Sequence, residues 1–311
     1  AVVYLKVVRG VLLVREAPPG WLSKARRFHS WPLRRRLIVL FAAAVAVFNL
    51  GSATMFFSGA TFGGDEPHYL MIAQSLLADG DIDLANNYAA KDFERFLQPG
   101  AVLTPHVLPG RKPGGQYSFH SPGTAVLLLP FYAAGRLFGK AGIILVVRFG
   151  LSLFGALLGL QMYLYALRKF GKDRVALLLW LLFSFTAPVF FYSIHVYPEI
   201  IVSLFAFTAF RVFRFSEKTG RCTLAGLGLL VSSFVWFHAL KYAFILAPLL
   251  LYGLWIVARK RGRPRDIVWL LAPAAVNLGL YFLFQATIYG SVNPTSVSWQ
   301  GAMDGKQTVG F

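Results

Sequence analysis

Two adjacent carboxylates stand where a long apolar segment ends, in the run Gly63-Gly64-Asp65-Glu66-Pro67-His68-Tyr69. Pro67 suits the first turn of a helix, and apolar residues continue after it at helical spacing. Asp65 and Glu66 therefore lie at the positive N-terminal end of a predicted helix, which favours their ionised forms. A carboxylate there can take a proton from an acceptor hydroxyl, or it can simply cap the helix. Spacing alone leaves these two interpretations evenly matched.

The next acidic run, Asp79-Gly80-Asp81-Ile82-Asp83, invites comparison with a calcium-binding loop. An EF-hand loop needs Gly at its sixth position and Glu at its twelfth. The residues here are Leu84 and Ala90, so the pattern fails. We expect Gly80 to end the preceding helix and the aspartates to lie in a solvated turn.

Imidazole and basic side chains follow in the same polar stretch, namely His106, Arg111, Lys112 and His120. Arg and Lys suit phosphate groups, and histidine binds a phosphate or a metal or transfers a proton. Contact of Arg111 and Lys112 with anionic lipid headgroups is an equally simple alternative. For His120 the simpler alternative is a solvated side chain.

Two later turns carry the remaining candidates. Glu199 ends the run His195-Val196-Tyr197-Pro198-Glu199, where it is either a charge partner for a helix N-terminus or a site residue. His238 and Lys241 are three residues apart, hence on one face of a helix, among aromatic residues typical of a membrane interface. Snorkelling to the interface would explain Lys241 alone better than it explains the pair.

The composition indicates a membrane protein. Of 311 residues, 57% are hydrophobic and only 14% are charged, with a net charge of +18. Soluble domains average about 25% charged residues, which argues against an ordinary soluble enzyme. A basic excess is normal in the cytoplasmic loops of membrane proteins, so it does not indicate nucleic acid as a partner. The single cysteine excludes an internal disulfide framework.

A membrane-spanning helix needs about 20 apolar residues. We predict seven crossings, all helical because lipid leaves no other partner for backbone polar groups. They fall at residues 37–57, 141–167, 175–194, 200–210, 223–240, 242–258 and 267–289.

One further apolar run, residues 123–139, contains Pro130. Whether it crosses the membrane can be judged from the charges on either side of it. If it does not cross, 22 basic residues lie on the cytoplasmic side and 8 outside; if it crosses, the numbers become 13 and 17. The positive-inside rule favours a re-entrant or interfacial helix. The prediction is then a basic cytoplasmic segment 1–36, a first crossing 37–57, an outer loop 58–140 with surface helices, six crossings within 141–289, and an outer segment 290–311. We expect this last segment to be truncated and the chain to be a fragment.

The arrangement resembles the GT-C glycosyltransferases, in particular the bacterial branch related to protein O-mannosyltransferases and aminoarabinose transferases. The resemblance is carried by Gly64-Asp65-Glu66-Pro67-His68-Tyr69, Ser118-Phe119-His120-Ser121-Pro122-Gly123 and Tyr197-Pro198-Glu199, and it covers residues 37–300. It implies an all-α multi-pass protein of the cytoplasmic membrane with a GT-C-like bundle. Such proteins transfer a sugar from a polyprenyl-phosphate donor to a protein, lipid or polysaccharide, at a hydroxyl or an amine, on the extracytoplasmic face.

The resemblance also implies roles for residues. Asp65 acts as base, Glu66 supports it and Glu199 is a second acid. We assign the donor phosphate to His238 and Lys241, with Arg111 and Lys112 as alternatives, and we add the candidate substrate-binding residues His68, Tyr69, His120 and Tyr197. Some relatives use a divalent cation; Mg²⁺ or Mn²⁺ on Asp65 and Glu199 is left open. The alternative function is a transporter or flippase for a lipid-linked sugar, which is less favoured because only Arg148 is deep in a crossing.

Overall fold

The computed structural model describes residues 28, 30–215, 220–261 and 264–294. Most of the predicted segments 1–36 and 290–311 therefore lie outside the described residues. The chain divides into two units, Ala1–Leu40 and Phe41–Phe311. Only the second contains the candidate site residues, and the following sections concern it.

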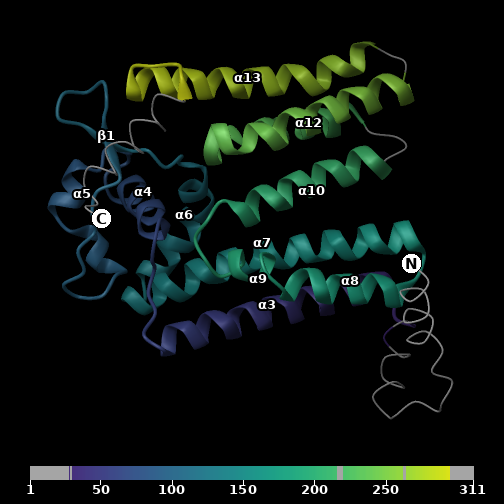
Figure 1. Ribbon diagram of the computed structural model, residues 1–311, viewed down its shortest axis with the longest axis horizontal. Helices are drawn as coiled ribbons and strands as arrows, with labels where there is room; N and C mark the ends of the chain where they lie inside the picture. Colours follow the sequence, from purple (N-terminus) through teal and green to yellow (C-terminus); the bar gives the residue numbers. More distant parts are fainter. Residues whose placement is uncertain (1–27, 29, 216–219, 262–263, 295–311) are drawn as a thin grey trace, which may run out of the picture. The chain divides into compact units, whose positions relative to one another are not determined.

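The described chain is mostly helical, as the composition predicts, and four helices are long and apolar enough to cross a membrane. They are α3 (Leu33–Phe57), α7 (Gly139–Phe170), α12 (Val235–Arg261) and α13 (Pro264–Tyr289). In three other predicted crossings the helices are shorter: α8 (Asp173–Phe185), α10 (Glu199–Phe215) and α11 (Arg221–Ser232). Figure 1 shows α7, α10, α12 and α13 running side by side.

Two of the predicted boundaries are wrong. The predicted crossing 175–194 is interrupted after Phe185, where Thr186 is extended and Pro188 follows two residues later, before the short helix α9 (Val189–Tyr192). Proline disfavours helical backbone in the residue before it, here Ala187, which is consistent with the end of α8 just ahead of it. The predicted break at Lys241 instead lies at residues 233–234, between α11 and α12.

The predicted outer loop contains α4 (Glu66–Ala78), α5 (Ala85–Ala89), the 3₁₀ helix η1 (Asp92–Arg95), strands β1 (Val107–Pro109) and β2 (Gln116–Ser118), and α6 (Gly123–Arg136). The strands pair antiparallel, with Leu108 opposite Tyr117. α6 has 14 residues and is not among the four long helices. As predicted, α4 begins after Asp65 and ends before Gly80, whose φ of +74° suits glycine.

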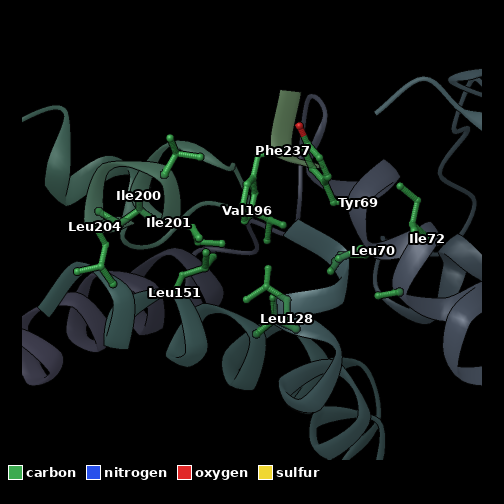
Figure 2. Close-up of a cluster of buried hydrophobic side chains, with 14 of the residues drawn as sticks. Tyr69, Leu70, Ile72, Leu128, Leu151, Val196, Ile200, Ile201, Leu204 and Phe237 are labelled. Carbon is green, nitrogen blue, oxygen red and sulfur yellow. The ribbon is translucent and has the colours of Figure 1, made fainter. Parts of the chain in front are cut away.

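A continuous apolar core joins the outer-loop helices to the long ones. Tyr69, Leu70 and Ile72 of α4 belong to the same buried cluster as Leu128 of α6 and Leu151 of α7 (Figure 2). The cluster continues into Val196, Ile200, Ile201, Leu204 and Phe237. Burial of this apolar surface holds the start of α4 against the start of α10, and so positions the polar residues next to both.

Arg148, predicted to lie deep in a crossing, is fully buried in α7. Its guanidinium donates a hydrogen bond to the Thr61 carbonyl at 2.8 Å and lies 5.2 Å from the centre of the Phe62 ring. The charge therefore anchors the segment that leads into α4, which is a structural role.

Candidate functional site

A cavity of about 520 Å³ lies where four distant segments meet. The segments are the start of α4, the residues after β2, the turn between α9 and α10, and the start of α12. Seven of the predicted site residues line it: Asp65, Tyr69, His120, Tyr197, Glu199, His238 and Lys241. Four others, Glu66, His68, Arg111 and Lys112, do not.

Asp65 occupies the N-cap position of α4, yet its side chain makes no capping hydrogen bond. Its Oδ1 instead lies 3.9 Å from His106 Nδ1 and 3.9 Å from His120 Nε2. The preceding Gly64 has φ +57°, and a Cβ there would lie 2.8 Å from the Tyr197 hydroxyl. Both the backbone conformation and the close approach require glycine, which lets the turn bring Asp65 to the cavity rather than to the helix end.

Three histidines pack together beside Asp65. His106 Nδ1 and His120 Nε2 are 3.0 Å apart, and the His68 ring stacks on His106 with centroids 3.7 Å apart. His68 Nδ1 is 2.9 Å from the Tyr88 hydroxyl. Burial, reinforced by the neighbouring imidazoles, lowers the pKa of His68 to about 2 and that of His120 to about 3. Burial also lowers the pKa of His106, so all three rings are neutral at pH 7.

Sequence reasoning named His106 as able to bind a phosphate or a metal or to transfer a proton, but it did not place it beside Asp65 and His120, a position that local structure explains. The hairpin of β1 and β2 extends by one more pair, in which the Phe119 amide donates to the His106 carbonyl at 3.3 Å. His106 is therefore beside His120, fourteen residues later. A predicted hairpin around the Pro-Gly-Gly turn was the signal that could have paired them.

Glu199 and Lys241 form an ion pair across the cavity. Glu199 begins α10, and its Oε2 is buried with no hydrogen-bond partner among the described residues. Lys241 follows a kink in α12 at His238, whose backbone is extended. The Lys241 amide donates to His238 Nδ1 at 3.3 Å. The predicted pair thus lines one cavity, but the predicted reason, a shared helical face, is wrong.

Glu66, next to Asp65, points away from the cavity and is buried. It accepts hydrogen bonds from the Gly63 amide at 2.9 Å and from the Val196 amide at 2.6 Å, and His195 Nδ1 lies 3.4 Å away. Glu66 therefore ties the start of α4 to the turn before α10.

Arg111 and Lys112, the alternative phosphate ligands, lie on the exposed hairpin turn. Lys112 Nζ is 2.9 Å from Asp83 Oδ2. The prediction of a solvated aspartate turn holds for Asp79 and Asp81, which are exposed, but not for Asp83, which is buried. Burial alone would raise the pKa of Asp83, but hydrogen bonds from the Gln116 amide, Lys112 and the Ala85 amide lower it. This ion pair holds the hairpin to the end of α4.

An apolar groove of about 620 Å³ begins one helical turn beyond the polar cavity. On α10, Ser203 follows Glu199 by four residues; on α12, Phe244 and Ile245 follow Lys241 by three and four. Residues at these spacings share a helix face. The groove continues along both helices and toward α7 and α8, and is lined by Leu158, Phe183, Ser203, Ala206, Phe207, Phe210, Phe244, Ile245, Pro248, Leu249 and Tyr252.

A cavity lined by the Asp65 carboxylate and the His120 imidazole on one side, and by the Glu199–Lys241 ion pair on the other, can hold an anionic group and move a proton beside it. The groove next to it suits a hydrocarbon chain. In comparisons with known proteins, no protein-family model matches the chain, and no curated protein or solved structure matches it significantly.

Proposed function

We propose that the chain is the membrane part of a glycosyltransferase that moves a sugar from a polyprenyl-phosphate donor to an acceptor hydroxyl on the extracytoplasmic face. The observation that carries the proposal is the placement of the polar cavity and the apolar groove one helical turn apart along the same two helices, α10 and α12. A polyprenyl phosphate has the matching form, an anionic head on a long apolar chain. The groove would hold the isoprenoid, and the cavity would hold the phosphate and its sugar.

The proposal includes seven crossings, formed by α3, α7, α8 with α9, α10, α11, α12 and α13. The short helices would complete their span with the segments next to them. With α6 at the surface, the cytoplasmic side carries most of the Lys and Arg residues, which supports this orientation. The cavity then faces the opposite side, where the start of α4 and the kink of α12 meet.

In the proposed reaction the acceptor hydroxyl attacks the anomeric carbon from the side opposite to the phosphate. Asp65 takes the hydroxyl proton as the new bond forms, and the bond from the anomeric carbon to the phosphate oxygen breaks. The attack inverts the configuration of the carbon. Lys241 then exchanges Glu199 for the departing phosphate, whose negative charge it stabilises.

The remaining cavity residues have supporting roles. Glu199 holds Lys241 in place when no donor is bound, and its second carboxylate oxygen can accept a hydrogen bond from a sugar hydroxyl. Burial raises the pKa of Tyr69 and of Tyr197, so both remain hydroxyl donors at all physiological pH values. Glu66 positions Asp65 through the turn that they share.

The test compares Asp65→Asn with Glu94→Gln, which removes an exposed charge from the same outer loop. Membranes containing the full-length protein are supplied with radiolabelled polyprenyl-phosphate mannose and polyprenyl-phosphate aminoarabinose, and transfer of label to membrane acceptors is measured. We expect Asp65→Asn to lower transfer at least about 100-fold, because a general base contributes that much. Glu94→Gln should leave the rate unchanged.

Detergent gel filtration shows whether each variant is folded. Full transfer by folded Asp65→Asn would rule out Asp65 as the base, and no transfer from either donor by the wild-type protein would overturn the proposed function.

A further inference from the structure

Asp65, His106 and His120 present three ligand atoms to one point in space. The carboxylate Oδ1, His106 Nδ1 and His120 Nε2 all lie within 4.8 Å of one another. The two nitrogens are 3.0 Å apart, and each lies 3.9 Å from the carboxylate oxygen. His106 and His120 lie side by side at the end of the β1–β2 hairpin, and tertiary packing brings Asp65 to them from the start of α4.

We propose that Asp65, His106 and His120 form a binding site for a divalent transition-metal ion, with Zn²⁺ as the best fit. Zn²⁺ binds histidine nitrogens and carboxylate oxygens at about 2.0–2.2 Å in a tetrahedral arrangement. Ligand atoms around such an ion are then about 3.3 Å apart, close to the separations found here. Moving the carboxylate about 0.6 Å nearer and the two nitrogens about 0.3 Å apart completes the triangle.

The ligand types discriminate between metals. Mg²⁺ takes oxygen ligands and keeps most of its waters, whereas imidazole suits Zn²⁺ and other transition metals. The site therefore differs from the Mg²⁺ or Mn²⁺ pair of Asp65 and Glu199 considered from the sequence. Glu199 is engaged instead with Lys241.

The surroundings of the two histidines fit a ligand role. His106 stacks with His68 and with Phe119, at centroid distances of 3.7 and 4.8 Å, which fixes the orientation of its ring. His68 is itself held by the Tyr88 hydroxyl. Side chains that orient the ligands in this way support metal sites in general.

The site has three protein ligands and one open side. Asp65 and His120 both line the 520 Å³ cavity, so a fourth ligand, water or an oxygen of a bound molecule, would come from there. Three protein ligands with one exchangeable position are the usual form of a catalytic rather than a structural zinc site. The binding site stands on its own geometry and does not depend on the proposed sugar transfer.

The test measures metal content and affinity without any donor. The full-length protein is purified in detergent, stripped with a chelator, reloaded with Zn²⁺ and desalted, and zinc is counted by elemental analysis. Co²⁺ replaces Zn²⁺ in a parallel sample, where its visible absorption reports nitrogen ligation. We expect one zinc per chain in the wild-type protein. His106→Ala and His120→Ala should each lose at least ten-fold in zinc affinity, and Asp65→Asn should also bind zinc more weakly.

Two further variants keep the test decisive. His195→Gln removes an imidazole outside the cluster and should keep its zinc. His120→Cys retains a zinc ligand, so it should still bind one ion while changing the Co²⁺ spectrum to that of a thiolate complex. No zinc in the wild-type protein, or equal zinc in folded His106→Ala and His120→Ala, would overturn the site. Zinc binding without sugar transfer would leave the site standing and reject only the proposed function.

Discussion

Asp65 and Glu66 are neighbours in the chain with opposite surroundings. Asp65 is partly exposed in the cavity beside two histidines, whereas Glu66 is buried and accepts two backbone hydrogen bonds. At the start of a helix, successive side chains point about 100° apart. Asp65 can therefore line the cavity while Glu66 is buried among its backbone partners. The two should not be treated as a single catalytic unit.

Substitution of Glu66 by Gln separates these roles. Gln has one side-chain oxygen, so either the Gly63 or the Val196 amide loses its acceptor. A buried donor left unpaired costs about 1–3 kcal/mol. We expect Glu66→Gln to lower the free energy of unfolding by that amount, which appears as a lower melting temperature in detergent. Asp65→Asn should change the free energy of unfolding by less than about 0.5 kcal/mol. An unchanged melting temperature for Glu66→Gln would show that the clamp contributes nothing to folding.

At the scale of elements, α10 and α12 combine two environments along their length. Each contributes one charged residue to the cavity near its start and a row of apolar residues to the groove beyond. The kink at His238 matters here, because it turns the first segment of α12 and caps the second through the Lys241 amide. An uninterrupted helix would not offer that imidazole as an acceptor.

This division predicts how the lipid is held. Lys241→Ala should weaken binding of undecaprenyl phosphate to the purified protein by about 10- to 100-fold, because a hydrogen bond to a charged group contributes about 1.5–3 kcal/mol. Binding of undecaprenol, which has no phosphate, should not change. The control Lys169→Ala removes an exposed lysine at the far end of α7. Equal losses for both lipids would mean that Lys241 does not hold the phosphate.

At the scale of the whole molecule, the charge distribution predicts the orientation of the proposed membrane protein. Cys222, the single cysteine, is exposed at the start of α11, next to one of the basic loops. We expect a membrane-impermeant maleimide to label it only after the cells are permeabilised. A cysteine introduced as Glu94→Cys in a Cys222→Ser background should be labelled in intact cells. Labelling of Cys222 in intact cells would indicate the opposite orientation, with the cavity on the cytoplasmic side.

Much of the helical framework follows from local sequence. Apolar runs long enough to cross a membrane predict α3, α7, α12 and α13, because helices in lipid must satisfy their own backbone groups. The start of α4 at Asp65-Glu66-Pro67 and its end at Gly80 also follow from nearby residues, since capping and positive φ are local requirements. The sequence also suggested that Asp65, Glu199, His238 and Lys241 would share a site, because they fall at helix ends predicted to face one side.

The tertiary structure alone decided the partners within that site. Nothing in the local pattern pairs Lys112 with Asp83 or Glu66 with the Val196 amide, because these contacts join residues 29 and 130 positions apart. They form because burial of the apolar core brings α4, the hairpin and the start of α10 together. Side chains that are alike in sequence then differ in what they contact: Glu66 accepts two backbone hydrogen bonds, whereas Asp65 lies beside two histidines.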